Sequence, residues 1–403
     1  MIKLALRNII RKKTHSALTL AAIICGVSGL ILAGGWISDI FTQLGEALIH
    51  SQSGHLQVYQ QGFYAAGSRA PEKYLIANPD EVGKRIAGYA EVDTVMSRLN
   101  FSGLLNNGRT DLPIVGEGVE PDKEARLGSF VQMTKGRRLA SKDAFGIEVG
   151  QGLANALKLS PGNTVNIVAN TLEGALNNLE FEVVGIFQSF SSEYDARAVK
   201  IPLAAAQELI ATKGVNALVI SLKKTADTDR IAAQLKGQLT PANLEVKTWV
   251  ELNDFYEKTV DLYQRQFGVL QLIILFMVLL GVANSVNMSV FERVGEFGTM
   301  MALGNRRNHV FRLILTESVL LGLIGSSIGV ALGVALALGI SSVGIEMPPP
   351  PNANIGYTAH IQVIPSALVV SFVIGFIATV VAAILPARRV SRTPIVDALR
   401  QNI

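Results

Sequence analysis

Charged residues are scarce in this chain of 403 residues. Asp, Glu, Lys and Arg make up 17% of it, whereas roughly a quarter is usual for a soluble domain, and 49% is hydrophobic. The single cysteine, Cys25, excludes a disulfide framework and any cysteine-based zinc or iron–sulfur site. The five histidines match no metal-binding spacing: His15, His50, His55, His309 and His360. The composition therefore indicates a membrane protein, and no metal ligands are predicted.

A nucleotide-binding loop is also missing from the sequence. The only glycine–lysine pair, Gly83 and Lys84, is followed by Arg85 instead of the Ser or Thr that a P-loop requires. No Ser/His/Asp arrangement is suggested by spacing, so no catalytic and no cofactor-binding residues are predicted. The long apolar runs contain no ionisable Asp, Glu, Lys or Arg, although proton-coupled transporters usually need one there. We therefore expect a protein that is not itself an enzyme, and any transport it drives must take its energy from another chain.

Four apolar runs are long enough to cross a bilayer, which takes about 20 residues. They lie at 14–38, 266–291, 318–345 and 347–387, and prolines at 348–351 together with His360 move the last helix to about 364–386. Lys and Arg gather beside these runs, at 1–13, 292–317 and 388–400. Since basic residues mark cytoplasmic segments, both termini and the central loop are expected inside, and 39–265 and the Pro-rich loop outside. Because this charge only flanks the spans, no nucleic-acid partner is expected.

The external segment has the pattern of an α+β domain. Apolar runs predict strands at 55–60, 111–116, 164–169, 181–187 and 217–222, and helices at 151–157, 203–211 and 227–239. A strand at 217–222, a helix at 227–239 and a strand at 244–249 form a split βαβ unit of ferredoxin-like kind. Residues at about 117–197 are predicted to be a β-rich insertion into that unit.

Helical periodicity continues beyond the membrane at both ends of this domain. Phe41, Leu44 and Leu48 extend the first span outward, and Val260 and Tyr263 lead into the second. Two such helices would form a stalk able to carry motion across the bilayer. The alternative is two short helices in solvent.

The predicted fold class is an α-helical membrane protein with four transmembrane helices and a large α+β extracytoplasmic domain on a helical stalk. Its predicted parts are a cytoplasmic amphipathic elbow helix (1–13), transmembrane helix 1 and stalk (14–50), the external domain (51–252), stalk and transmembrane helix 2 (253–291), a cytoplasmic coupling helix (292–308), transmembrane helix 3 (309–345), the Pro-rich loop (346–363), transmembrane helix 4 (364–387) and a cytoplasmic tail (388–403).

Two motifs suggest contacts. Gly325, Gly329 and Gly333 form overlapping G-x-x-x-G units, which let helix backbones approach closely in lipid, although the partner helix stays open. After the second span, a short helix is predicted to expose an adaptable apolar surface beside charged residues, and Gly304 ends it. The residues of this surface are Glu292, Arg293, Glu296, Phe297, Met300, Met301 and Leu303. The alternative is a loop whose apolar side rests in lipid headgroups.

These motifs resemble a known family. The pattern E-R-x-x-E-x-G-x-x-x-A-L-G at 292–304, followed by a helix with Glu317, is similar to that of the MacB/LolC/LolE/FtsX permeases of ABC transporters. The end of the chain, 385–400, resembles the family's P-A-x-x-A-x-x-x-P-x-x-A-L motif, except that Val390 replaces a small residue. The segment 5–13 resembles its elbow helix, and 149–165 its periplasmic core signature.

The resemblance implies a dimeric permease of the bacterial inner membrane, bound to a separate cytoplasmic ATPase that holds ATP and Mg²⁺. It implies that ATP-driven motion passes through residues 292–304 and the stalk to the periplasmic domain, a process called mechanotransmission. Lipoproteins or lipid-like molecules are the expected substrates, with membrane lipid and a periplasmic carrier as further partners. The alternatives are a MacB-like exporter of peptides or drugs working with an outer-membrane channel, and FtsX-like signalling to periplasmic enzymes. The sequence does not decide whether the second permease is identical or a paralogue, or whether the Pro-rich loop gates a groove or is a spacer.

Overall fold

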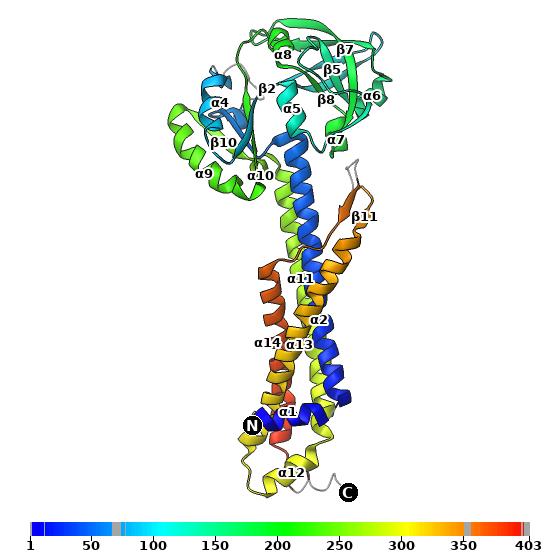
Figure 1. The fold of residues 1–403 in the computed structure, drawn as a ribbon, viewed down its shortest axis with the longest axis vertical. Helices are drawn as coiled ribbons and strands as arrows, with labels where there is room; N and C mark the ends of the chain where they lie inside the picture. The colour runs from blue at the N-terminus through cyan, green and yellow to red at the C-terminus, as the bar shows by residue number, and fades with distance from the viewer. Residues whose placement is uncertain are drawn as a thin grey trace. The chain divides into compact units, whose positions relative to one another are not determined.

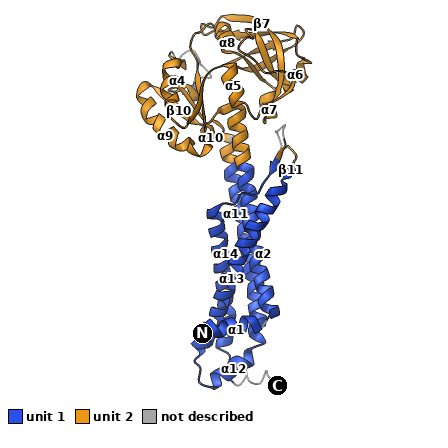
Figure 2. Cartoon of the chain, viewed as in Figure 1, with its two compact units in different colours: residues 1–41, 260–346, 358–403 blue, residues 42–259, 347–357 orange. Residues whose placement is uncertain are grey.

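The computed structural model describes residues 2–11, 13–66, 74–76, 78–349, 356–395 and 398. They form two compact units (Figure 2). The membrane unit comprises Met1–Phe41, Val260–Glu346 and Thr358–Ile403, and the extracytoplasmic unit comprises Thr42–Thr259 and Met347–Tyr357.

Four helices in the described residues are long and apolar enough to span a bilayer, as predicted. They are α2 (Lys13–Leu48), α11 (Asp254–Phe291), α13 (Arg307–Val343) and α14 (Pro365–Ser391) (Figure 1). With 36 and 38 residues, α2 and α11 are roughly 55 Å long, well beyond a hydrocarbon core of about 30 Å. The rings of Phe41 and Tyr263 meet edge to face at 5.8 Å, so the two helices touch where they leave the membrane unit. These lengths agree with a stalk and exclude separate short helices.

The glycines of α13 lie against α2. A Cβ built on Gly325 would be 3.0 Å from a side-chain carbon of Ile23, on Gly329 2.8 Å from one of Val27, and on Gly333 2.9 Å from one of Ile31. Atoms at these separations overlap, so the helices approach this closely only because α13 carries no side chain at the contact. The partner of the glycine motif, left open by the sequence, is the first span of the same chain.

Replacing Gly329 by leucine is expected to lower the unfolding temperature of the detergent-purified protein. The new side chain must push α13 away from Val27, and such overpacking costs roughly 1–3 kcal/mol. Gly339→Leu is the matched control on the same helix, because a Cβ there meets no atom within 4 Å. Equal unfolding temperatures for the two variants would contradict the close packing of α13 on α2.

The ferredoxin-like part of the extracytoplasmic unit is the predicted split βαβ unit. It contains β1 (Leu56–Gln60), α4 (Pro79–Ala87), the first half of β2 (Val92–Asn106), β9 (Ala217–Leu222), α9 (Thr228–Leu239) and β10 (Leu244–Thr248). The strands are antiparallel in the order β10-β1-β9-β2. Every residue of β9 is buried, because β9 lies inside this sheet, which explains why five of its six residues are apolar.

The inserted part is a small closed barrel. Its strands pair in the circuit β2, β3 (Asp111–Val119), β8 (Ala198–Pro202), β5 (Gly146–Gly150), β7 (Leu176–Gln188), β6 (Thr164–Asn170) and back to β2. The barrel is filled by apolar side chains such as Leu105, Ile147 and Phe181. Around it lie β4 (Gln132–Gly136), α5 (Pro121–Leu127), α6 (Gln151–Leu157), α7 (Ser192–Asp195) and α8 (Leu203–Ile210).

The insertion is wider than the predicted 117–197. The long strand β2 belongs to both parts: Arg98 still pairs with β9, whereas Leu99 already pairs with β3. No turn separates the two parts at this point, so the sequence carries no boundary signal. At the other end, α8 packs on the barrel core through Ala206 and Leu209.

The remaining elements are short. They are α1 (Ile2–Arg11), the π-helical turn Ile49–Ser53, α3 (Phe63–Ala66), α10 (Trp249–Leu252), α12 (Val294–Ala302), β11 (Ile345–Met347) and β12 (Tyr357–Ala359), with single 3-10 turns at Thr225–Asp227 and Thr240–Ala242. Residues 350–355 of the Pro-rich loop, most of the tail beyond 395, Lys12 of the predicted elbow helix and the side chain of Phe255 in the predicted stalk lie outside the described residues.

Candidate functional site

A separate short helix, α12, connects α11 to α13 (Figure 1). It ends because Gly304 adopts a φ of +95°, which favours glycine. The backbone N–H groups of Gly304 and Asn305 then donate to the carbonyls of Met301 and Met300, both at 3.1 Å, in a common helix-ending pattern. The chain can therefore reverse direction and start α13 at Arg307.

One face of α12 is buried in the membrane unit. Val294, Phe297 and Met301 follow helical spacing and belong to the apolar core that also contains Val310 and Leu313 of α13. Phe297 is 0% exposed, so the prediction of an exposed apolar surface is wrong for Phe297 and Met301. Both sides of α12 carry apolar residues, and spacing alone does not tell which side faces the core.

The opposite side of α12 is accessible. Leu303 is 81% exposed, and Glu292 and Glu296 are exposed as well. Met300 is half-buried and packs beside the core. Among the predicted apolar contact residues, Leu303 is thus the clear candidate for contact with another chain.

Arg293 fixes α12 to the following helix. Its Nη1 lies 2.9 Å from Oε2 of Glu317 on α13, and its Nε lies 3.0 Å from Oε2 of Glu296. The guanidinium carbon is 4.9 Å from the ring centre of Phe297. Because an arginine this buried needs both partners and packing to offset its desolvation, Arg293 holds one geometry of α12 relative to α13.

The elbow helix α1 joins the same network. Asn8 Nδ2 donates to Glu317 Oε1 at 2.6 Å, and Arg11 Nη2 lies 2.8 Å from Glu296 Oε1. Arg11 belongs to the elbow helix predicted at 1–13, and its side chain pairs with α12. We call Asn8, Arg11, Arg293, Glu296 and Glu317 the cytoplasmic network; it links α1, α12 and α13.

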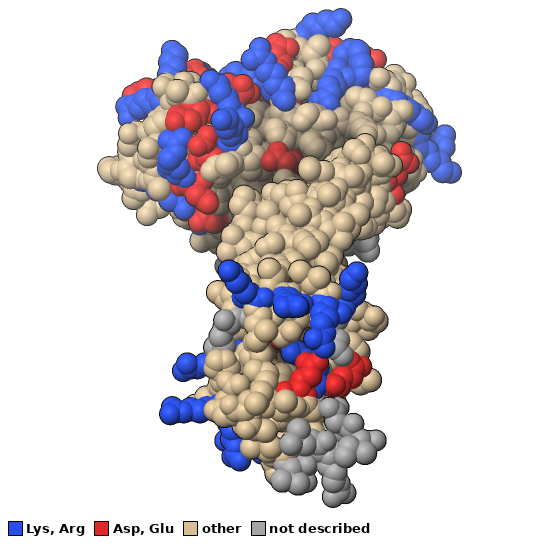
Figure 3. All heavy atoms as spheres, turned by 60° about the horizontal axis from the view of Figure 1, so that its bottom comes forward, with Lys and Arg blue, Asp and Glu red and all other residues tan. Residues whose placement is uncertain are grey.

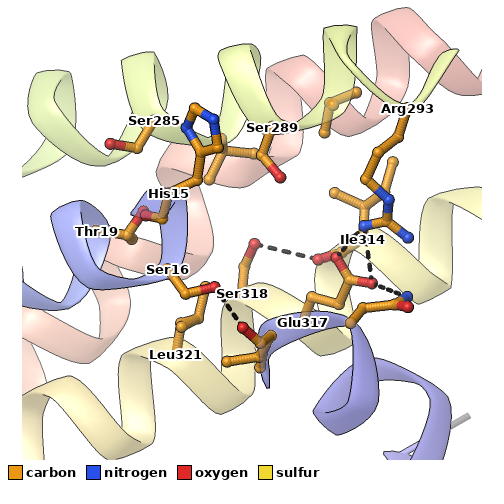
Figure 4. A pocket seen from close by; sticks show the side chains of 14 residues that line it. His15, Ser16, Thr19, Ser285, Ser289, Arg293, Ile314, Glu317, Ser318 and Leu321 are labelled. Carbon is orange, nitrogen blue, oxygen red and sulfur yellow. Dashed lines mark hydrogen bonds and ion pairs between the residues drawn. The ribbon is translucent and has the colours of Figure 1, made fainter. Parts of the chain in front are cut away.

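A small polar cavity lies beside this network (Figure 4). Its volume of about 30 Å³ has room for about one water molecule. Hydroxyl groups of Thr19, Ser285 and Ser289 line it together with Arg293 and Glu317, and nearby His15 Nε2 lies 2.9 Å from Glu292 Oε1. The cavity thus places polar side chains of α2 and α11 beside the Arg293–Glu317 pair.

Basic side chains surround this end of the membrane unit, next to a wide surface without charged residues (Figure 3). They include the exposed residues Lys3, Arg7, Arg306, Arg307 and Arg312. On α1, the exposed apolar residues Ile2, Leu6 and Ile10 accompany this charge. The arrangement is typical of an interfacial helix at the headgroups of anionic lipids.

Sequence reasoning missed the partners of Glu317. It noted this residue only through the family pattern, whereas Asn8 and Arg11 entered only as part of a basic elbow. One signal was available: Glu317 is the sole charged residue between Arg312 and Glu346. A carboxylate in so apolar a helix requires a partner. Among the described residues, no cluster of three His, Cys, Asp or Glu side chains is placed to hold a metal.

Two family models match the chain. The MacB-like periplasmic core domain matches residues 16–238, which is more than half of the chain, and the FtsX-like permease C-terminal domain matches residues 268–395. The second match covers α12, α13 and α14 and includes Arg293, Glu296 and Glu317 of the cytoplasmic network.

Three curated relatives carry transporter names. An uncharacterized ABC transporter permease of Methanocaldococcus jannaschii is 24% identical over 99% of this chain and 97% of its own length. A macrolide export ATP-binding/permease protein MacB of Hyphomonas neptunium is 22% identical over 99% of this chain and 60% of its own length. The lipoprotein-releasing system transmembrane protein LolE of Haemophilus influenzae is 22% identical over 77% of both chains.

Members of this family work with a cytoplasmic ABC ATPase. The four spans and the matched periplasmic core place this chain in the inner membrane with a large periplasmic domain. The chain belongs to the MacB- and FtsX-like family of ABC transporter permeases.

Proposed function

We propose that this permease converts ATP hydrolysis by a separate cytoplasmic ATPase into motion of its periplasmic domain, and that the motion extracts or exports lipoproteins or lipid-like substrates from the inner membrane. The similarity to LolE, which extends over 77% of both chains, supports this substrate class. The long α2 and α11 supply the mechanical connection, since both continue far beyond a bilayer's thickness.

The observation that carries the proposal is the way α12 is held. Arg293 and the buried Phe297 fix one side of α12 to the membrane unit, while Leu303, Glu292 and Glu296 stay accessible. A force applied to the accessible side is therefore transmitted to α1 and α13 through the cytoplasmic network. This is the property that a coupling helix needs.

In this proposal, the partner ATPase supplies the energy and binds the nucleotide. The sequence has no P-loop, so ATP and Mg²⁺ would be held by the ATPase. A second permease copy, or a paralogue, would complete the transporter. Of the four spans, α11 has the most exposed apolar stretch: 17% of its most hydrophobic residues are buried, against 33% in each of the other spans. We propose that part of this exposed surface faces the second permease.

Two other functions agree with the family. The relative named MacB is a macrolide exporter, which supports a peptide or drug substrate. An outer-membrane channel would then be a further partner. Signalling to periplasmic enzymes without transport is the third function, and the same FtsX-like domain would carry the motion. The three functions share α12 as the coupling helix and differ in what the periplasmic domain handles.

The first test concerns the energy source. The purified chain is expected to hydrolyse no ATP, whereas co-expression with the cognate ABC ATPase should give a stable complex that hydrolyses ATP. Phosphate release would be measured for the chain alone, for the complex, and for a complex whose ATPase carries a Lys→Ala change in its P-loop as control. ATP hydrolysis by the isolated chain would contradict the proposal.

The substrate would be tested in proteoliposomes that contain the complex and a fluorescent triacylated lipoprotein. ATP should release the lipoprotein to a soluble carrier protein if lipid-anchored proteins are the substrate. Uptake or export of a macrolide without lipoprotein release would favour the MacB-like alternative, and ATP hydrolysis that moves neither would favour signalling.

A further inference from the structure

Four charged side chains are buried together inside the extracytoplasmic unit. Arg98 of β2, Glu117 of β3, Glu124 of α5 and Lys200 of β8 come from separate elements. Arg98 is 2% exposed and Lys200 3%, and both glutamates are buried as well. We call these four residues the Arg98 cluster.

Their contacts connect the ferredoxin-like part to the barrel. Nη2 of Arg98 lies 2.9 Å from Oε2 of Glu124, and Nζ of Lys200 lies 2.6 Å from Oε1 of the same carboxylate. Nη1 of Arg98 is 3.7 Å from Oε2 of Glu117. Arg98 sits where β2 passes from one part to the other, since it is the last residue of β2 that pairs with β9. Glu124 is thus held from the sheet by Arg98 and from the barrel by Lys200.

The same arginine also reaches the end of α2. Nη1 of Arg98 donates to the backbone carbonyl of Gln52 at 2.6 Å. Gln52 belongs to the π-helical turn that follows α2, and such turns are often found at functional sites. A single guanidinium thereby touches the end of the first long helix, α5 and, through Glu124, the barrel strand β8.

Glu124 and Lys200 of the cluster stay charged at neutral pH. Burial opposes ionisation of Glu124, but the attraction of Arg98 and Lys200 outweighs it and lowers the pKa of this carboxyl to about 2. Burial alone would lower the pKa of Lys200, whereas Glu124 and Glu117 raise it. The charges of Glu124, Arg98 and Lys200 therefore stabilise one another in the interior.

Stability alone does not account for this arrangement. Removing four charges from water costs several kcal/mol per ion, and apolar residues of similar volume often stabilise a protein at least as well. Charged groups differ from apolar ones because their hydrogen bonds fix the direction and distance of the partner. The planar guanidinium group of arginine restricts the geometry of its partners most strongly. The distinctive consequence of the cluster is a defined geometry between the end of α2 and the barrel.

We propose that Arg98 is a positioning residue that locks the barrel to the end of α2, so that displacement of this helix moves the barrel instead of being lost in slippage between the two. The inference rests on the proposed function, because it assumes that α2 delivers ATP-driven motion. It assigns to the ion cluster, rather than to apolar packing, the transfer of that motion within the periplasmic domain.

The test uses the full chain in complex with its ATPase, in nanodiscs of phosphatidylethanolamine and phosphatidylglycerol. Spin labels are attached to Val343→Cys at the end of α13 in the membrane unit and to Leu176→Cys on β7 of the barrel, in a Cys25→Ser background, since the two side chains are 86% and 76% exposed. The distance between them reports movement of the barrel relative to the membrane unit. Distances between the labels are measured by pulsed electron paramagnetic resonance, without nucleotide and with ADP and vanadate. The parent protein should show a nucleotide-dependent shift in this distance.

The decisive variant makes the cluster neutral: Arg98→Met, Glu117→Gln, Glu124→Leu and Lys200→Met together. We expect it to retain the ATPase and to unfold within a few degrees of the parent, while the nucleotide-dependent shift falls to less than half. Arg137→Met is the matched control, because Arg137 pairs with Asp143 at an exposed position of the inserted part. The control should keep the full shift.

The outcomes separate the two proposals. If the parent shows no shift, the proposed function fails; if the parent and the neutral variant shift equally, the role of the Arg98 cluster is overturned. Should the neutral variant not fold, Arg98→Lys decides instead. Lysine keeps the charge but lacks the fork that reaches Gln52 and Glu124 together, so a reduced shift supports the proposal and a full shift refutes it.

Discussion

Replacing Leu303 by glutamate is expected to weaken binding of the cognate ATPase by at least about 30-fold. Leu303 is the large apolar side chain that α12 leaves 81% exposed, directly before the glycine that ends the helix. Apolar anchors at the centre of an interface contribute 2 kcal/mol or more, and about 1.4 kcal/mol corresponds to a factor of ten. A carboxylate in their place must be desolvated without a partner, which adds to the loss.

The membrane fold should survive this change, because Leu303 contributes nothing to the buried core. Binding would be measured by titrating the purified ATPase onto the permease in nanodiscs, with ATP hydrolysis as a second readout. Leu176→Glu is the matched control, since it is the same substitution at a similarly exposed site of the periplasmic domain. ATPase binding and hydrolysis unchanged in Leu303→Glu would show that α12 is not the coupling helix.

A second substitution distinguishes contact from folding. Met301 is buried among the core residues of the membrane unit, so Met301→Glu is expected to lower the unfolding temperature, unlike Leu303→Glu. Two apolar positions separated by a single residue should thus fail in different ways. A coupling helix anchored on one face and exposed on the other predicts this contrast, whereas a loop resting in headgroups does not.

The spans, the stalk and the split βαβ unit could be predicted because each leaves a local signal. A span needs only length and the absence of charge, and the strand at 217–222 lies inside a sheet, so that all its residues except Ser221 are apolar. The barrel boundary could not be predicted, because Arg98 and Leu99 are consecutive residues of one strand that belong to different parts. Pairing between distant strands leaves no trace in local periodicity.

The coupling helix shows the same limit. Its residues were predicted, but their roles divide: Arg293, Phe297 and Met301 face the membrane unit, and Leu303 faces away. The partners that decide this division, Asn8 and Glu317, stand 285 and 24 residues from Arg293 in the sequence. These residues come together only in the folded protein, and their contacts then determine which side of α12 is buried and which is accessible.

Replacing Glu317 by leucine is expected to destabilise the membrane unit by roughly 3 kcal/mol. The change leaves the buried guanidinium of Arg293 with Glu296 as its remaining carboxylate and removes the acceptor of Asn8. Breaking a buried ion pair from one side costs about 3–5 kcal/mol, and the surviving contact with Glu296 favours the lower end of that range. The free energy of unfolding would be measured by titrating the purified protein with SDS in mixed micelles.

Restoring electrical balance should recover much of this loss. In the double variant Arg293→Met and Glu317→Leu, no charge is left buried without its partner, so its unfolding free energy should exceed that of Glu317→Leu alone. Glu292→Leu is the control: its contact with His15 is more exposed, and such pairs contribute at most about 1 kcal/mol. If Glu317→Leu were no less stable than Glu292→Leu, the buried pair would not be what holds α12 on α13. Since the accessible side of α12 has functional meaning only while this pair fixes the other side, the same result would also remove the structural basis for Leu303 as the contact residue.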